Sequence, residues 1–291
     1  MSTSQTKRKS LRAALAAREL IVAPGAYDAI TARLIEQAGF AAVYMTGAGA
    51  SAARGYPDYG LLTLSEMAES AGAIAGSIDV PLISDADTGY GNVLNVTRTV
   101  REFEQRGVAA VHIEDQVSPK RCGHLDDKEV VSREEFSAKI RAAVAARTDA
   151  DFVVIARTDA GAVMGPEEAL IRANLALAAG ADMAFVEAVQ SLEQMAAVPR
   201  EVKGPCLLNL VAGGKTPAVS IAEAGAMGYQ AIILPGILIF EVVEALDRVL
   251  QAVRQTGRPP VPAASIRNIF QRFGSDAWDA VRQDFDTIAG A

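Results

Sequence analysis

Cysteine and histidine are scarce in this chain, which has two of each in 291 residues. Two cysteines, Cys122 and Cys206, cannot build the disulfide framework of a small secreted protein. We therefore expect both thiols to be free in a reducing, cytoplasmic compartment. Cys206 begins an apolar run and is predicted to be a buried structural thiol.

Long apolar runs and an excess of positive charge are also missing. No run reaches the length needed to span a membrane, and no apolar segment of a signal peptide follows the basic start. The chain carries 28 Lys and Arg against 35 Asp and Glu, a formal charge of −7, which argues against a nucleic-acid partner. Half of the residues are hydrophobic, enough for one large core.

Short apolar stretches alternate with helical patterns along the chain, after an amphipathic stretch over 11–20. The predicted strands are 20–24, 41–45, 81–84, 108–113, 152–156, 183–186, 206–209 and 230–234. Eight strands separated by helices are typical of an α/β protein with a (β/α)8 TIM barrel. An open doubly wound sheet is the alternative, but no glycine-rich dinucleotide fingerprint follows the first strand.

The C-terminal segment continues past the eighth strand with helical patterns over 237–256 and from 264 to about 288. Prolines at 259, 260 and 262 separate the two patterns. We predict a barrel catalytic domain over 1–257 and a helical tail over 258–291. The tail has an apolar side that includes Ile266, Phe270 and Trp278, and we expect a neighbouring subunit to cover it.

Polar residues stand at the carboxyl end of most of the predicted strands. They are Thr46, Asp85, Asp87, Glu114, Arg157, Glu187 and Asn209. In a (β/α)8 barrel these ends converge on the active site. Several acids at a barrel mouth are costly unless a metal or ligand partners them.

The acids predict a metal site. Asp85, Asp87 and Glu114 are hard oxygen donors without a companion His or Cys at ligand spacing, which favours Mg²⁺ or Mn²⁺ over Zn²⁺. Arg157 offers a fork suited to a carboxylate, and the glycines at 47 and 49 offer backbone N–H groups. The site is therefore suited to a small dicarboxylate or 2-oxo acid.

A loop over 120–124 reads Lys-Arg-Cys-Gly-His. A thiol beside two cations, with a glycine next to it, is typical of a reactive cysteine, and we expect Lys120 and Arg121 to lower the pKa of Cys122. The alternative is a solvated basic loop with an incidental cysteine.

Five motifs together resemble the isocitrate lyase/phosphoenolpyruvate mutase superfamily, over roughly residues 11–285. They are Ser-Asp-Ala-Asp-Thr-Gly-Tyr-Gly at 84–91, His-Ile-Glu-Asp at 112–115, Lys-Arg-Cys-Gly-His at 120–124, Ala-Arg-Thr-Asp at 156–159, and Asn209 with Gly-Lys-Thr-Pro at 214–217. In that family the cysteine loop marks the enzymes that cleave C–C bonds. The mutases and phosphonopyruvate hydrolases carry a different loop.

The resemblance implies a role for each candidate residue. The implied Mg²⁺ ligands are Asp58, Asp85, Asp87 and Glu114, and the implied catalytic residues are Cys122 as acid, Tyr44 as base, Arg157 and His124. The implied substrate-binding residues are Thr46, Gly47, Ala48, Lys120, Arg121, Gly123, Glu187 and Asn209. The implied assembly is a homotetramer, a dimer of dimers that exchange the helical tail.

The implied reaction is a retro-aldol (Claisen-type) cleavage of a substituted 2-hydroxy dicarboxylate or tricarboxylate into a 2-oxo acid and a carboxylic acid. The motif Gly-Gly-Lys-Thr-Pro at 213–217 and the lack of a hydroxyl over 236–239 favour an alkylmalate such as 2,3-dimethylmalate over 2-methylisocitrate. An oxaloacetate decarboxylase or acetylhydrolase, a carboxyphosphonoenolpyruvate mutase-like enzyme and a non-enzymatic dicarboxylate-binding barrel remain alternatives.

Overall fold

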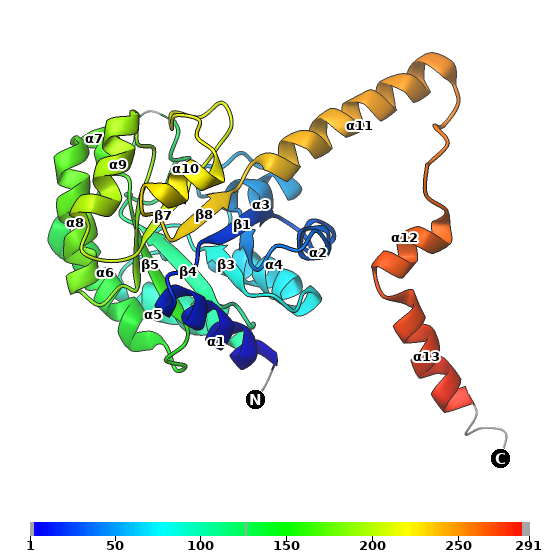
Figure 1. Cartoon of the computed structure of the whole chain (residues 1–291), viewed down its shortest axis with the longest axis horizontal. Coiled ribbons are helices and arrows are strands. Elements are labelled where there is room, and N and C mark those ends of the chain that lie inside the picture. Colours follow the sequence, from blue (N-terminus) through cyan, green and yellow to red (C-terminus); the bar gives the residue numbers. More distant parts are fainter. Residues whose placement is uncertain (1–2, 126, 287–291) are drawn as a thin grey trace. The chain divides into compact units, whose positions relative to one another are not determined.

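The structure, a computed structural model, describes residues 3–125 and 127–286 and is built on a closed barrel of eight parallel strands (Figure 1). The strands are β1 (Ile21–Ala26), β2 (Val43–Met45), β3 (Leu82–Asp85), β4 (Ala110–Glu114), β5 (Val153–Thr158), β6 (Met183–Val186), β7 (Cys206–Asn209) and β8 (Ala231–Leu234). Each strand pairs with the next, and β8 pairs with β1. The predicted (β/α)8 barrel is confirmed, and the open sheet is excluded.

Several strands extend further toward their carboxyl ends than the apolar runs indicate. Asp85 is the last residue of β3, Glu114 is the last of β4, and Arg157 lies inside β5. Glu114 and Arg157 are direct partners in the β4–β5 register. Polar residues continue these strands because the hydrogen-bonded ladder to the neighbouring strands does not depend on side-chain polarity. The register therefore places an acid and a cation side by side at the mouth.

Helices follow the strands around the outside of the barrel (Figure 1). They are α2 (Ala29–Gln37), α3 (Gly47–Ala53), α4 (Leu64–Ser77), α5 (Val93–Gln105), α6 (Arg133–Ala146), α7 (Ala160–Val163), α8 (Pro166–Ala178), α9 (Leu192–Glu201) and α10 (Ile221–Ala226). Side chains cap several of them: Thr63, Asn92 and Ser220 each form a capping box at a helix start.

The first helix differs from its prediction. Helix α1 spans Thr3–Ala16, so it begins before residue 11 and ends before residue 20. It ends early because Arg18 has a left-handed backbone, with φ of 55°. Three of its cations fix it to the barrel: the ammonium of Lys7 donates to the carbonyls of Ala75 and Ile78 at the end of α4, and Arg8 and Arg12 pair with acids after α6 and before β6.

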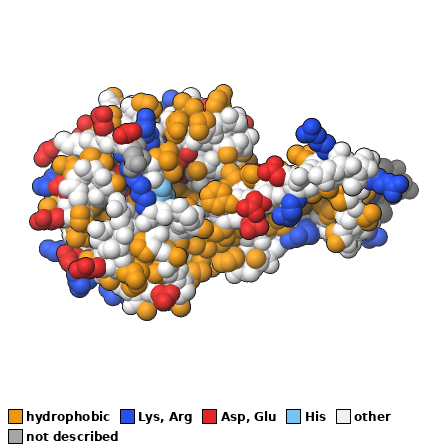
Figure 2. Space-filling model, turned by 90° about the horizontal axis from the view of Figure 1, so that it is seen from above, with side chains coloured by type: hydrophobic (Ala, Val, Ile, Leu, Met, Phe, Trp, Pro, Cys, Tyr) orange, Lys and Arg blue, Asp and Glu red, His pale blue; other side chains and the backbone are white. Residues whose placement is uncertain are grey.

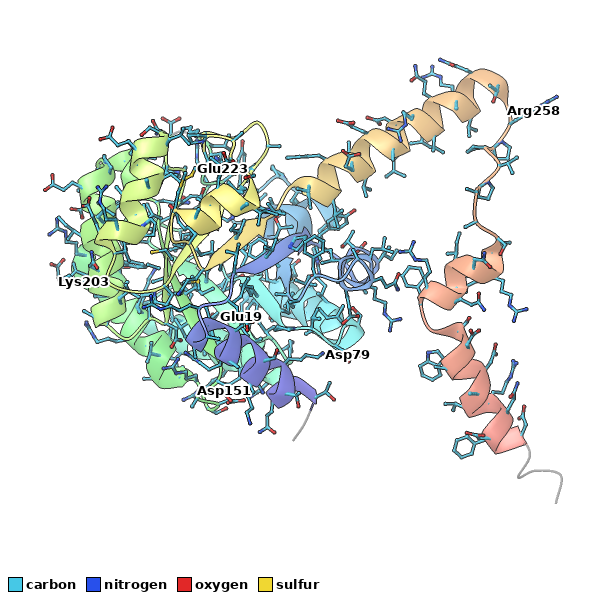
Figure 3. The ribbon with its side chains drawn as sticks, in the orientation of Figure 1. Glu19, Asp79, Asp151, Lys203, Glu223 and Arg258 are labelled. Carbon is cyan, nitrogen blue, oxygen red and sulfur yellow. The ribbon has the colours of Figure 1, made fainter. Side chains whose placement is uncertain are left out.

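The core has an inner and an outer part. Inside the barrel, residues such as Ile83, Ile155, Phe185 and Leu207 pack together, and Leu11 of α1 packs against this cluster. Outer clusters pack the strands against their helices. Charged residues such as those labelled Glu19, Asp79, Lys203 and Glu223 are exposed and point away from the ribbon (Figure 3). Helix α1 packs at the amino ends of the strands, which is the end of the barrel opposite to the predicted site.

The chain divides into two compact units, Met1–Phe240 and Glu241–Ala291. Helix α11 (Ile237–Thr256) agrees with the prediction over 237–256, and the predicted domain boundary at residue 257 stays a prediction. The predicted helix from 264 is two helices, α12 (Ile266–Arg272) and α13 (Ser275–Asp286), because Gly274 breaks it with φ of 87°. Its predicted end at 288 lies outside the described residues.

The tail helices expose the apolar side chains that the sequence places on one side. Ile266, Phe270, Trp278 and Phe285 are between 60% and 75% exposed. Within residues 3–125 and 127–286, no helix is both long and apolar enough to cross a membrane.

Candidate active site

A cavity of about 290 Å³ opens at the carboxyl ends of the strands. It brings together predicted residues from five strand ends and two loops: Tyr44, Thr46, Ala48, Asp58, Asp85, Cys122, Gly123, His124, Arg157, Glu187 and Asn209. A histidine reaches the surface beside blue cationic side chains in the space-filling view (Figure 2). A larger cavity of about 660 Å³ lies along α8 and α9, and Glu187 is the predicted site residue that it shares. The chemistry therefore concentrates in the smaller cavity.

Asp85 is held by backbone donors. The N–H of Gly47 donates to its Oδ2 at 3.2 Å, and the N–H of Asp87 donates to its Oδ1 at 2.9 Å. A Cβ at position 47 would collide with Oδ2 of Asp85, so a glycine is required there. The predicted role of Gly47 as a donor to a substrate anion thus has a competitor, because Asp85 already accepts its N–H.

Lys120 bridges two of the predicted metal ligands. Its Nζ donates to Oδ1 of Asp58 and lies 3.0 Å from Oδ1 of Asp87. Burial alone would lower the pKa of Lys120, but Asp87 and Asp58 raise it well above its usual value. Burial also raises the pKa of Asp87 to about 6, although Lys120 lowers it in part. The lysine that we predicted to bind substrate therefore neutralises two acids in this state.

Arg157 lies among three carboxylates. Its Nη1 is 3.2 Å from Oε2 of Glu114, its Nε donates to Oδ2 of Asp159 at 2.9 Å, and its Nη2 is 3.6 Å from Oε2 of Glu187. Within the part of the chain that the structure describes, neither carboxylate oxygen of Glu114 has a hydrogen-bond partner, although both are buried. Burial raises the pKa of Glu114 well above its usual value, even though Arg157 lowers it. A buried carboxylate without a donor calls for a further partner.

The predicted ligands fit a hard divalent cation in kind, and their arrangement shows what competes with it. All four are carboxylates, and neither oxygen of Glu114 accepts a hydrogen bond from the described residues, although Oε2 forms an ion pair with Arg157. Among the described residues, no three His, Cys, Asp or Glu side chains gather as a metal-binding group. Lys120 and Arg157 instead pair with these acids. The assignment of Asp58, Asp85, Asp87 and Glu114 as the Mg²⁺ ligands stays a prediction.

Cys122 lines the cavity and is half-buried, but its environment differs from the prediction. Burial raises the pKa of the thiol above its usual value, and Asp58 adds to this, whereas Arg157 and Lys120 lower it only in part. Lys120 lowers this pKa as expected, but the expected net direction was wrong, because desolvation outweighs the nearby cations. The thiol is therefore protonated near neutral pH.

The side chain of Arg121, a predicted substrate-binding residue, lies outside the cavity. Its side chain is half exposed, and its Nη1 lies 3.7 Å from Oδ2 of Asp127, outside the cavity. Its backbone is fixed instead, because the side-chain amide of Gln116 donates to its carbonyl and accepts from its N–H, both at 2.9 Å. Substrate binding by Arg121 stays a prediction.

His124 and Asn209 both approach Glu187. The Nε2 of His124 lies 3.3 Å from Oε1 of Glu187, and the Nδ2 of Asn209 donates to Oε2 at 3.2 Å. The Nδ1 of His124 accepts from the N–H of Lys215 at 3.1 Å. Burial lowers the pKa of His124, although Glu187 raises it, so the imidazole is neutral at pH 7.

The hydroxyl of Tyr44 lies 2.7 Å from Nε2 of His112, at hydrogen-bonding distance. Burial raises the pKa of Tyr44 well above its usual value, and Asp85 raises it further. Burial likewise lowers the pKa of His112 to about 4, so this ring is neutral. The role of Tyr44 as a base stays a prediction, and the raised pKa counts against a free phenolate.

Sequence reasoning missed two kinds of site residue. The first is charged: Asp159, which we considered only as a possible helix cap, makes no cap hydrogen bond and pairs with Arg157 and with Lys128. Its spacing of two residues from Arg157 was the available signal, since such residues share one side of a strand. The second is the apolar wall, defined as Tyr56, Val211, Ile239 and Phe240, which line the cavity. The lack of a hydroxyl over 236–239 pointed to Ile239, but nothing in the local sequence marks Tyr56 or Phe240.

Comparison with known proteins agrees with this fold and identifies the family. The profile of the family described as phosphoenolpyruvate phosphomutase matches residues 11–254. The chain is 48% identical to 2,3-dimethylmalate lyase from Eubacterium barkeri over 81% of this chain and 82% of that protein. It is 44% identical to 2-methylisocitrate lyase from Aeropyrum pernix over 85% and 80% of the two chains. The structure of oxaloacetate acetylhydrolase with the inhibitor 3,3-difluorooxalacetate superposes with a TM-score of 0.92, at 40% identity over 97% of each chain.

A (β/α)8 barrel with a carboxylate-rich mouth and a cysteine loop defines a class of enzyme rather than a binding scaffold. The chain belongs to the phosphoenolpyruvate mutase/isocitrate lyase superfamily. Within it, the similar 2,3-dimethylmalate lyase and 2-methylisocitrate lyase are carbon–carbon lyases. The resemblance carried by the five motifs is thereby confirmed.

Proposed function

We propose that this enzyme cleaves the C2–C3 bond of an alkyl-substituted malate, of the 2,3-dimethylmalate type, into a 2-oxo acid and a carboxylic acid. One observation supports the proposal above the others. The cavity combines a protonated thiol, Cys122, and the guanidinium of Arg157 with the apolar wall of Tyr56, Val211, Ile239 and Phe240. The thiol can protonate a carbanion, the guanidinium can bind a carboxylate, and the apolar wall can accept an alkyl substituent.

The reaction needs a proton to leave the substrate hydroxyl and another to reach carbon. The hydroxyl proton passes to Tyr44 while the Tyr44 hydroxyl gives its own proton to Nε2 of the neutral His112, 2.7 Å away. As the C2–C3 bond breaks, its electron pair passes to the departing fragment and C2 becomes the carbonyl of the 2-oxo acid. Cys122 gives the fragment its thiol proton on carbon, and the resulting thiolate takes back the proton held by the Tyr44–His112 pair. Arg157 and Asn209 hold the carboxylate of the fragment while charge develops on it. Mg²⁺, when bound, polarises the 2-hydroxy acid and withdraws charge from the forming carbonyl.

The charge balance of the cavity supports a dicarboxylate over a tricarboxylate. Of the cavity-lining residues that the structure describes, Arg157 is the one cation at pH 7, since His124 is neutral. Arg157 already faces Glu114, Asp159 and Glu187. The third carboxylate of 2-methylisocitrate would meet the apolar wall without a counter-charge, which is costly. An alkyl group fits there without that cost.

Oxaloacetate is the substrate class that competes with an alkylmalate. The similarity to oxaloacetate acetylhydrolase extends over 97% of both chains, so hydrolysis or decarboxylation of oxaloacetate uses a site of the same fold. Among the solved structures the identity is 42% to 2,3-dimethylmalate lyase and 40% to oxaloacetate acetylhydrolase, so identity alone does not separate the two reactions. The apolar wall and the protonated thiol favour C–C cleavage of a 2-hydroxy acid. A carboxyphosphonoenolpyruvate mutase-like activity has less support, because the protonated Cys122 faces the cavity and such a rearrangement needs no acid that protonates carbon.

The proposed substrate is tested by a cleavage screen with Mg²⁺ present. We expect 2-oxo acid from 2,3-dimethylmalate, with kcat/KM higher than for 2-methylisocitrate by roughly tenfold or more, because the third carboxylate lacks a partner. Formation of 2-oxo acid is read by a coupled dehydrogenase, and acetate and CO₂ from oxaloacetate are assayed in parallel. Faster acetate or CO₂ release from oxaloacetate than cleavage of any 2-hydroxy acid would replace the proposal by the hydrolase or decarboxylase.

The proposed metal site is tested by binding as well as by activity. We expect Mn²⁺ to bind the metal-free protein in a calorimetric titration and EDTA to abolish turnover. Glu114→Gln should weaken Mn²⁺ binding by roughly tenfold or more, because it removes a charged donor from the set. Glu36→Gln is the control, since Glu36 accepts the N–H groups of Asp79 and Val80 at the amino end of β3. Equal Mn²⁺ affinity in wild type and Glu114→Gln would remove Glu114 from the ligand set.

The proposed acid is tested by Cys122→Ser. A serine hydroxyl is a far weaker acid than a thiol, so kcat should fall by about 10²–10⁴-fold, while Mn²⁺ binding stays unchanged. In D₂O the released carboxylic acid should carry one deuterium at the cleaved carbon. Cys206→Ser is the matched control, because Cys206 is buried in β7 away from the cavity. A covalent substrate adduct on Cys122 in mass spectra would make the thiol a nucleophile instead.

We also propose that four chains assemble as a dimer of dimers that exchange the helical tail, in a reducing cytoplasm where both cysteines stay free. The support is the exposed apolar face of the tail, since Phe270, Trp278 and Phe285 are large and 60–75% exposed. We expect light scattering to report a tetramer of the full chain and a smaller species or aggregate after truncation at Pro262. An active, monodisperse full-length monomer would contradict the exchange.

A further inference from the structure

Lys128 joins the cysteine loop to the catalytic strand ends. It lies after the loop, before α6, and its side chain is only 2% exposed. Its Nζ donates to the backbone carbonyl of Gly123, next to Cys122, and to Oδ1 of Asp159 at 3.0 Å. One ammonium therefore connects the loop that carries the thiol to the segment that follows β5.

Asp159 passes this connection to Arg157. Both of its oxygens accept from the guanidinium, Oδ2 from Nε at 2.9 Å and Oδ1 from Nη2 at 3.3 Å. The backbone of Asp159 is itself fixed, because its N–H donates to Oδ1 of the buried Asp115 at 2.8 Å, and Thr158 and Arg172 hold the other oxygen of that acid. Lys128 thus binds to a rigid anchor and not to a free surface acid.

Gly123 shows how closely the loop packs on this anchor. A Cβ at position 123 would collide with Nη2 of Arg157 and with Cγ of Glu187. The backbone of the loop therefore lies directly on the Arg157–Glu187 pair, and the Gly123 carbonyl is the group that Lys128 holds in this position. A small displacement of that carbonyl would lift the neighbouring Cys122 from the cavity.

We propose that Lys128 is a positioning residue: by bridging the Gly123 carbonyl and Asp159, it holds the cysteine loop closed on Arg157. The acid and the guanidinium are then in place at the same time. This inference rests on the proposed function only for its catalytic consequence. The bridge itself is made by residues of this chain alone.

A buried ammonium with these partners could also act only on stability, and a second buried lysine provides the comparison. Lys7 donates to the carbonyls of Ala75 and Ile78 at the other end of the barrel, as Lys128 does to Gly123. Lys7→Met should therefore cost stability of a similar kind without touching the loop. Cys206, buried in β7, reports general loosening within each variant.

The experiment is the rate of iodoacetamide alkylation of Cys122 and Cys206, read by mass spectrometry at one pH without substrate or metal. We expect Lys128→Met to speed alkylation of Cys122 by roughly tenfold or more, the opening that follows from losing charge-assisted hydrogen bonds. Cys206 should stay slow, and Lys7→Met should leave Cys122 near the wild-type rate. Removing a cation would by itself lower the fraction of Cys122 that is thiolate. Faster alkylation therefore reports exposure of the loop.

Lys128→Arg keeps a cationic donor and should return the rate toward that of wild type, and Lys128→Gln replaces Lys128→Met if the latter does not fold. With the substrate found in the cleavage screen, Lys128→Met should lower kcat more than it raises KM. An unchanged Cys122 rate in the folded variant, or equal acceleration of Cys122 and Cys206, would overturn the proposal. Because alkylation needs no substrate, it decides this point even if the cleavage screen fails.

Discussion

The organisation of the mouth depends on one buried cation, Arg157, and on the acids that face it. A guanidinium in the interior is tolerated only when paired and hydrogen-bonded, and here Glu114, Asp159 and Glu187 supply the charge. Two of these acids in turn fix another part of the site. Glu187 meets His124 and Asn209, and Asp159 meets Lys128. Removing Arg157 would leave three buried carboxylates without their common partner.

The barrel produces this arrangement through strand register. Glu114 and Arg157 face each other because β4 and β5 pair with these two residues as partners, and Arg157 pairs next with Phe185, two residues before Glu187. The guanidinium also lies over the ring of Phe185, at 5.2 Å from its centre. The apolar filling of the barrel therefore supports the charged layer above it. Stability at one end and chemistry at the other use the same strands.

Much of this was predictable from the sequence, because a barrel strand is a short apolar run and its carboxyl end is the active-site side. The strands and the cavity residues such as Asp85, Arg157 and Asn209 follow from that rule. Pairing between charges does not, since it depends on distances across the mouth: Lys128 and Asp159 are 31 positions apart. The pKa of Cys122 was missed for a related reason, because neighbours in sequence suggested cations, whereas burial sets its direction. The break at Gly274 was also hidden, since a glycine within an apolar pattern does not reveal its backbone angle.

The charge count at the mouth links metal, substrate and selectivity. Among the described residues, Asp58, Asp85, Asp87, Glu114, Asp159 and Glu187 face only three buried cations, Arg157, Lys120 and Lys128. A dicarboxylate would add two negative charges to a layer that is already short of positive charge, and a divalent cation is the compensation that all-oxygen donors favour. The metal and the dianion should then bind interdependently, each lowering the electrostatic cost of the other. By the same reasoning a third carboxylate has no compensating charge left, and the site accepts an uncharged alkyl group at that position.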